Sequence, residues 1–268
     1  MSRSRASALA VLLLVTACSG GGGSRGGVAT GPSGQSLFLP SQATVAGDTA
    51  SFDVDGNNSL TVTTDGGLDQ TLPVASVEPG TGLVEWATPA RNAGALGVLP
   101  GSGPDFQHTA FGIWMVSNDP GAFDATLPVD TVDAGAFYGG FRTARDNMPS
   151  SGSATYDGAA FAFEHQGTTL VDAMTGTFTA NANFGAGTIS GQASLLSNDA
   201  SSWGTINTGT MAINGNGFAS APNGSTSSNG HVGSTSGNFL GPNANEIGGA
   251  FDLDNGSTGV KGSFGAIR

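Results

Sequence analysis

Glu246 lies in the stretch of the chain that looks most like a functional loop. It stands in GNFLGPNANEIGGAFDL, residues 237–253, between a Pro-Asn step and a pair of glycines. A carboxylate on a loop could transfer protons, but general acid–base catalysis requires a second group within hydrogen-bond reach. No second carboxylate or histidine adjoins Glu246 in the sequence. We therefore expect Glu246 to be structural, accepting hydrogen bonds from the backbone amides of a turn.

The residues around Glu246 predict one helical turn between two strands. Proline has no backbone donor and a fixed φ, which suits the first turn of a helix. Asparagine favours turns, and the glycine pair restarts an extended chain. The residues predicted to form this structural turn are Gly241, Pro242, Asn243, Glu246, Gly248 and Gly249.

The sequence shows no pattern typical of a metal site or of an enzyme. His108, His165 and His231 lie in three separate segments, whereas a zinc site requires four convergent ligands. The residues from Asp53 onward resemble a calcium loop only superficially, because Asn58 takes the place that an EF-hand gives to glycine. No Gly-x-Ser-x-Gly nucleophile motif is present. We predict no catalytic residue, no metal and no cofactor.

The N-terminus predicts export and a lipid anchor. Residues 1–17 combine two arginines with an apolar run that is too short to span a bilayer, which is typical of a signal peptide. Small residues lead into Cys18, the only cysteine of the chain, and this site resembles the lipobox of bacterial lipoproteins. That resemblance implies acylation of Cys18, and the following Ser19 implies sorting to the outer membrane. Residues 18–34 are then a Gly-rich flexible tether.

The acidic composition excludes one class of partner. Loss of Arg3 and Arg5 with the signal peptide leaves six basic against twenty acidic residues. Such a surface repels nucleic acid, and no cluster of basic residues offsets this charge.

Strict alternation of apolar and polar residues predicts an all-β fold. In residues 176–184, Phe178, Ala180 and Ala182 alternate with threonines and asparagines, and the same period returns in 188–195, 210–217 and 260–267. Short turns separate the strands, and glycine within them suits a strongly coiled sheet. We expect a small soluble antiparallel up-and-down β-barrel of about eight strands over residues 106–268. A transmembrane barrel fits less well, because its lipid face requires large aliphatic residues and aromatic girdles.

Residues 35–105 are less regular. A hairpin is predicted in 51–64 and a further strand in 82–87, but proline and glycine interrupt the rest. We expect a smaller, handle-like β segment beside the barrel.

The C-terminal half resembles the β-barrel domain of the transferrin-binding protein B family of surface lipoproteins. The resemblance is carried by SGSATYDG (151–158), MTGTFTANANFGAGTISGQAS (174–194), GNFLGPNANEIGGAFDL and KGSFGAIR (261–268). FGIWMVS (111–117) resembles the first barrel strand of that family. Together these stretches cover about residues 106–268.

The resemblance implies a lipid-anchored binding protein of the outer membrane or cell surface. Its partners would be a host or environmental protein, haem or an outer-membrane TonB-dependent receptor, in the acquisition of iron, haem or another solute. The namesake family has two lobes, and this chain has room for one. The lobe surface that docks transferrin therefore cannot be assigned residue by residue in this chain. Trp203, in the predicted loop 198–204, is a candidate partner contact, since exposed aromatic residues anchor interfaces; alternatively it caps the barrel mouth. A structural or interaction lipoprotein of the envelope without a small-molecule ligand is the alternative function.

Overall fold

The computed structural model describes residues 37–268, which form three antiparallel sheets and three short 3-10 turns. The first sheet has four strands in the order β1-β2-β3-β4. Its strands are β1 (Gln42–Ala43), β2 (Thr49–Val54), β3 (Leu60–Thr64) and β4 (Asp69–Leu72). The second sheet has five strands in the order β10-β8-β7-β6-β5. Its strands are β5 (Val74–Val77), β6 (Leu83–Ala87), β7 (Ala93–Val98), β8 (Thr109–Val116) and β10 (Asp133–Gly140).

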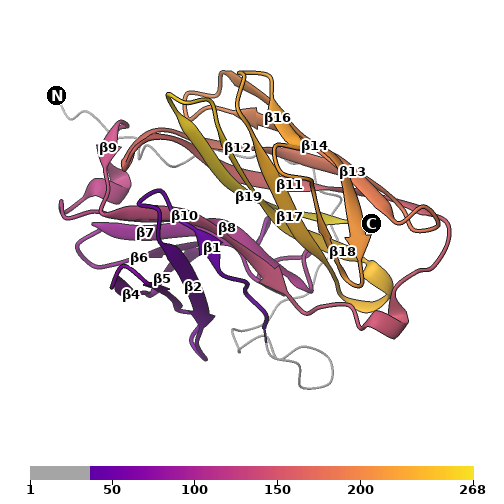
Figure 1. The fold of residues 1–268 in the computed structure, drawn as a ribbon. Coiled ribbons are helices and arrows are strands. Elements are labelled where there is room, and N and C mark those ends of the chain that lie inside the picture. Colours follow the sequence, from indigo (N-terminus) through magenta and orange to yellow (C-terminus); the bar gives the residue numbers. More distant parts are fainter. Residues whose placement is uncertain (1–36) are drawn as a thin grey trace.

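The third sheet is a closed barrel made by the C-terminal part of the chain. Its strands are β11 (Ser153–Gln166), β12 (Thr169–Asn183), β13 (Thr188–Leu196), β14 (Ser202–Asn214), β15 (Gly217–Ala219), β16 (Ser225–Ser227), β17 (Val232–Leu240), β18 (Glu246–Asp254) and β19 (Gly259–Ile267). Neighbouring strands pair antiparallel around the ring, and β11 pairs with both β12 and β19, which closes the ring. The short strands β15 and β16 share one position between β14 and β17. The predicted eight-stranded up-and-down barrel is therefore confirmed (Figure 1).

Side chains fill the barrel interior. Along β12 the buried residues Phe178, Ala180 and Ala182 alternate with exposed threonine and asparagine, as the two faces of a strand require. The rings of Phe178 and Phe264 stack across the interior with centroids 3.9 Å apart. Phe239 packs against three further aromatic rings in the same core. Small barrels are commonly packed in this way.

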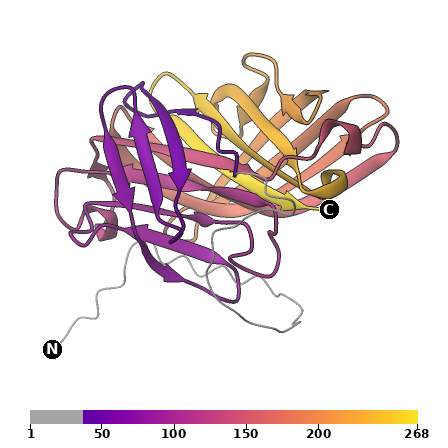
Figure 2. The same cartoon turned by 90° about the horizontal axis from the view of Figure 1, so that it is seen from below.

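The five-stranded sheet is the middle layer of the molecule. Its β10 residues alternate between two cores: Ala134, Ala136 and Tyr138 belong to the cluster shared with the barrel. Phe137 belongs instead to the cluster shared with the four-stranded sheet. Figure 2 shows the two N-terminal sheets together on one side of the barrel. We call these two sheets, β1 to β8 and β10, the handle.

Two strands that the sequence analysis placed in the barrel lie in the handle instead. Residues 111–117 were expected to be the first barrel strand, but β8 pairs with β7 and β10, and the first barrel strand is β11. All eight residues of β8 and of β10 are buried, because the middle layer is covered on both faces. Strands buried on both faces lack the polar alternation that marks a barrel wall.

Three short 3-10 turns and one small strand complete the described chain. They are η1 (Ala122–Asp124), η2 (Arg145–Asn147), η3 (Pro242–Ala244) and β9 (Val129–Asp130), which pairs with β12. Within residues 37–268, no helix has the length and apolar character needed to cross a bilayer.

Candidate functional site

The predicted turn around Pro242 is present between β17 and β18. Pro242 begins η3, Gly241 and Asn243 have positive φ angles of 70° and 57°, and β18 starts at Glu246. The left-handed conformation suits glycine and is tolerated by asparagine, which explains these residue types at these positions.

The carboxylate of Glu246 joins the barrel to the handle. It is 4% exposed and accepts hydrogen bonds from the backbone N–H of Gln107 (3.0 Å to Oε1) and of His108 (3.1 and 3.0 Å to the two oxygens). The hydroxyl of Thr109 donates a further bond of 2.7 Å to Oε2. A buried carboxylate requires such full satisfaction. We expected the donors to be amides of the turn itself. They belong instead to the segment that enters β8.

Other hydrogen bonds fix the same turn from three sides. The Tyr156 hydroxyl, on β11, donates to the carbonyl of Ala244 (2.7 Å), and burial raises the pKa of Tyr156 to about 12. The Thr143 hydroxyl donates to the carbonyl of Gly241 (2.7 Å). The amide of Arg268 donates to the carbonyl of Asn245 (2.9 Å). The turn is therefore a junction of the handle, the first barrel strand and the end of the last one.

The two glycines after Glu246 allow close packing on both faces of β18. A Cβ on Gly248 would lie 3.1 Å from the methyl group of Thr109, on the handle side. A Cβ on Gly249 would meet the ring of Phe264 inside the barrel. On the neighbouring strand, a Cβ on Gly265 would meet the ring of Phe111. The outer face of β18 and β19 thus lacks side chains at Gly248 and Gly265, where Thr109 and Phe111 of the handle pack.

Trp203 is not an exposed loop residue. It lies in β14, is 9% exposed and belongs to the barrel core. Its indole N–H donates to Glu164 Oε2 (3.1 Å), and its ring lies 5.7 Å from that of His231. This placement agrees with the alternative that Trp203 caps the barrel, and it removes the premise of an exposed aromatic anchor. Cys18, the predicted lipidation site, lies outside the described residues.

The three histidines do not converge. His231 is buried and contacts the hydroxyls of Ser227 and Thr258, each at 3.0 Å. His165 lies in β11, where burial lowers its pKa. Across residues 37–268, no group of three or more His, Cys, Asp or Glu side chains is placed to hold a metal ion.

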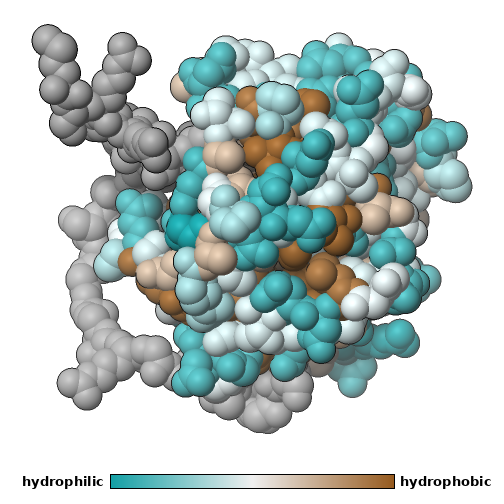
Figure 3. Space-filling view, turned by 90° about the vertical axis from the view of Figure 1, so that its left-hand side faces the viewer, coloured by the Kyte–Doolittle hydropathy of each residue, from teal (hydrophilic) through white to brown (hydrophobic). Residues whose placement is uncertain are grey.

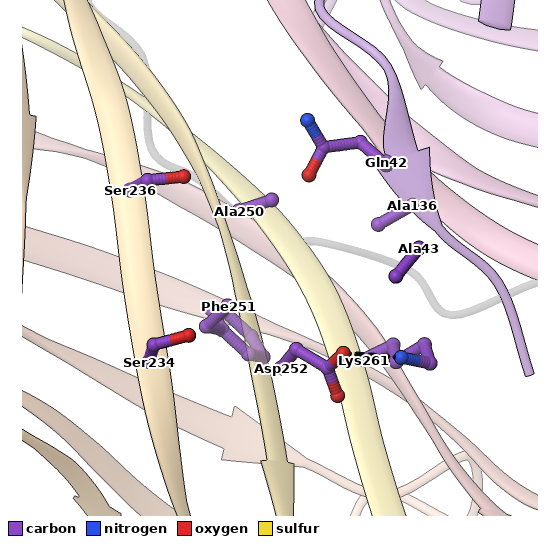
Figure 4. Close-up of a pocket in the computed structure, with 9 residues that line it drawn as sticks. All are labelled: Gln42, Ala43, Ala136, Ser234, Ser236, Ala250, Phe251, Asp252 and Lys261. Atoms are coloured by element: carbon purple, nitrogen blue, oxygen red, sulfur yellow. Dashed lines mark hydrogen bonds and ion pairs between the residues drawn. The ribbon is translucent and has the colours of Figure 1, made fainter. Parts of the chain in front are cut away.

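A cavity of about 180 Å³ lies between the handle and the outer face of the barrel. Its lining residues are Gln42, Ala43, Ala136, Ser234, Ser236, Ala250, Phe251, Asp252 and Lys261. Figure 4 shows the carboxamide of Gln42 and the hydroxyls of Ser234 and Ser236 directed into the space between β1 and the barrel. We call this cavity the handle pocket.

One end of the handle pocket is charged. Lys261 is the only lysine of the chain. It is 9% exposed at its side chain and forms an ion pair with Asp252, whose side chain is 49% exposed. The pocket therefore presents an ion pair, whose lysine is largely excluded from water, beside hydroxyl and amide groups. An anionic group of a small polar ligand can reach Lys261 only in place of the carboxylate of Asp252, which is half exposed.

No residue of this pocket was predicted from the sequence to belong to a site. Gln42 and Lys261 are separated by most of the described chain, so no local spacing brings them together. A single signal was available: the only lysine of the chain stands within a strand of alternating residues.

A second, apolar hollow of about 30 Å³ lies between the middle sheet and β12, on the side of η1 and β9. Phe123, Leu127, Phe163 and Leu170 contribute to its lining. Figure 3 views the molecule from that side and shows hydrophobic surface interspersed with hydrophilic residues.

Fold and site together define a filled eight-stranded barrel with a docked two-sheet handle, a class of protein whose usable surfaces lie outside the barrel. Residues 148–268 match the family described as the C-lobe and N-lobe beta barrels of Tf-binding protein B. The chain thus contains a transferrin-binding protein B-like barrel domain, as the resemblance implied. No curated protein matches the sequence.

Solved structures share the fold at low sequence identity. A transferrin-binding protein B double mutant from Haemophilus parasuis Hp5 has 21% identity and a TM-score of 0.56, over 86% of this chain and 44% of that chain. The intact Ap-TbpB with N and C lobes has 19% identity and a TM-score of 0.56, over 86% and 45% of the two chains. The isotype 1 protein from serogroup B Neisseria meningitidis has 18% identity and a TM-score of 0.52, over 87% and 43%. This chain therefore spans less than half the length of these structures.

Proposed function

We propose that this chain is a lipid-anchored lipoprotein of the bacterial outer membrane that binds a partner through the outer surfaces of its barrel and handle. The single observation that carries this proposal is the packed interior of a transferrin-binding protein B-like barrel. Because side chains occupy the inside, recognition has to use the outer wall, the loops or the handle. Binding, not catalysis, is the role of this arrangement, and no cofactor is assigned to it.

The anchor in this proposal is Cys18, followed by the tether 18–34. The signal-like residues 1–17 and the single cysteine support it. Metabolic labelling with a fatty-acid analogue tests this step: wild-type protein should incorporate the label, and Cys18→Ser should not. Protease treatment of intact cells then decides which face of the membrane carries the protein.

The partner is proposed from the names of the structural relatives. Those proteins are transferrin-binding proteins, and this chain covers less than half of each. For this chain we propose that the partner is a host or environmental protein or haem. A TonB-dependent receptor of the outer membrane would act with this chain in the uptake.

Pull-down from the native membranes tests the partner. Acylated protein should enrich one outer-membrane receptor reproducibly, while Cys18→Ser, expressed at the same level, should enrich it less because it is not held at the membrane. Purified protein is then tested with haemin, by the Soret absorption, and with transferrin, by surface plasmon resonance. If neither probe binds and no receptor is enriched, the proposed acquisition function is wrong.

The alternative is a structural or interaction lipoprotein of the envelope without a small-molecule ligand. The filled barrel core is compatible with it, since a packed barrel requires no internal ligand. Enrichment of envelope structural proteins, in place of a receptor, would favour this alternative.

A further inference from the structure

One side of the handle pocket is the edge of β10, and part of this edge has unpaired backbone hydrogen-bonding groups. Gly140, on β10, exchanges backbone hydrogen bonds with Phe38 (2.8 and 3.1 Å), and the carbonyl of Ala134 accepts one from the amide of Val45 (2.9 Å). Alternate residues of an antiparallel strand direct their N–H and C=O to the same side. The N–H and C=O of Ala136 therefore point to this edge too. Within residues 37–268, neither group has a hydrogen-bond partner there.

The gap in pairing has a cause in the sequence. Pro40 has no N–H to donate, so the segment between Phe38 and Val45 cannot follow the edge of β10 throughout. Gln42 and Ala43 leave that edge and pair with β2 in the neighbouring sheet. The departure opens the handle pocket beside Ala136.

An unpaired backbone position at this depth requires a partner. Ala136 is 4% exposed, and buried backbone groups are almost always bonded to protein, water or ligand. One strand residue that presents both its N–H and its C=O can accept one residue of an added extended peptide, because a hydrogen-bonded pair exchanges both bonds.

The remaining walls limit the size and charge of that peptide. Phe38 bonds to Gly140 at one end of this edge, and Val45 bonds to Ala134 at the other. A long strand therefore cannot pair along the whole edge. The side walls carry the small residues Ala43 and Ala250. The volume of about 180 Å³ is close to that of a cavity that holds one benzene molecule, roughly 150 Å³. The ion pair of Lys261 with Asp252 stands at one end, so a ligand carboxylate has to take the place of the half-exposed Asp252.

We propose that the handle pocket binds a short peptide of small residues that has a free C-terminal carboxylate. One residue of the peptide pairs with the backbone of Ala136, and the C-terminal carboxylate of the peptide replaces Asp252 at the ammonium group of Lys261, while the half-exposed Asp252 turns to solvent. The hydroxyls of Ser234 and Ser236 and the carboxamide of Gln42 complete the polar lining. This site goes beyond the proposed partner binding and does not depend on it.

Calorimetric titration with L-alanyl-L-alanine tests the ligand class. We expect saturable binding at one site, about tenfold weaker binding of alanyl-alanine amide, and no binding of acetate at the same concentrations. Because the chain has one lysine, acetylation of Lys261 followed by mass spectrometry gives a second readout, and the dipeptide should slow it. Equal binding of the dipeptide and its amide would overturn the role of the carboxylate. Absence of binding at millimolar dipeptide would overturn the proposal.

Variants separate the site from general effects on the fold. Lys261→Gln should weaken dipeptide binding about tenfold, while Arg145→Gln, an exposed position outside the pocket, should leave it unchanged. Ala43→Leu should block the pocket from the β1 side without altering the lysine. Circular dichroism establishes that each variant is folded. Unchanged binding by both pocket variants would place the dipeptide elsewhere, and a partner pull-down unaffected by Lys261→Gln would show that the two binding functions are separate.

Discussion

Replacement of Glu246 by alanine should loosen the junction between handle and barrel. The change leaves the amides of Gln107 and His108 and the hydroxyl of Thr109 without their acceptor. An unsatisfied buried donor costs about 1–3 kcal/mol. Gln107 is exposed and its amide can bond to water, so two donors remain in the count. We expect a loss of about 2–6 kcal/mol of unfolding free energy.

Glu246→Gln should be milder than Glu246→Ala. The amide keeps one acceptor oxygen for the two backbone donors, and its NH₂ group can donate to the hydroxyl of Thr109. The lost charge weakens the hydrogen bonds, by about 1–2 kcal/mol in total. The matched control is Glu78→Ala, an exposed glutamate whose removal should change stability by less than about 0.5 kcal/mol.

Urea unfolding followed by tryptophan fluorescence measures these differences. Trp86 and Trp114 lie in the handle core and Trp203 in the barrel core, so backgrounds that keep tryptophan in only one part, with phenylalanine in the other, report the two parts separately. Each Glu246 variant is compared with Glu246 in the same background. Wild-type transitions should coincide, and those of Glu246→Ala should separate, because the handle loses its attachment. A Glu246→Ala protein within about 0.5 kcal/mol of wild type, with coincident transitions, would refute the reasoning.

Three further predictions concern packing and pH. Gly265→Ala should destabilise the protein by about 1–3 kcal/mol in urea unfolding, because the added Cβ meets the ring of Phe111. Gly185→Ala, whose Cβ makes only an ordinary van der Waals contact with Asn183, should be nearly neutral. The stability of wild type should fall as the pH rises from about 10 to about 12, because Tyr156 ionises near pH 10 in the unfolded chain and near pH 12 in the folded one. Tyr156→Phe should flatten that part of the stability profile. An unchanged profile would contradict the assignment to Tyr156. Trp203→Ala should cost about 3–5 kcal/mol of stability and leave binding of an identified partner unchanged. Weaker partner binding by a folded variant would show that Trp203 contacts the partner.

The barrel was predictable because its wall separates two environments. In residues 177–183 of β12, each threonine or asparagine faces water and each alanine or phenylalanine faces the core, so the sequence itself shows the period of two. The same reasoning failed for β8, whose residues are buried on both sides between the barrel and the four-stranded sheet. An apolar run of this kind indicates a strand but not the sheet to which it belongs.

The site divides along the same line. The turn at Pro242 follows from local residue types, and sequence reasoning predicted it. The donors to Glu246 could not be predicted, because Gln107 and His108 are more than 130 positions away in the chain. The handle pocket was hidden for the same reason: it arises where three sheets meet, and no single segment contains enough of it to form a motif.

The last described strand of the barrel makes two sets of contacts on which assembly depends. β19 closes the ring against β11, and its outer face receives Phe111 and the rest of the middle sheet. Without β19 the ring would be open, and the handle would have no surface on which to pack. Barrel closure and handle docking should therefore occur in one cooperative folding step, because both require the same strand.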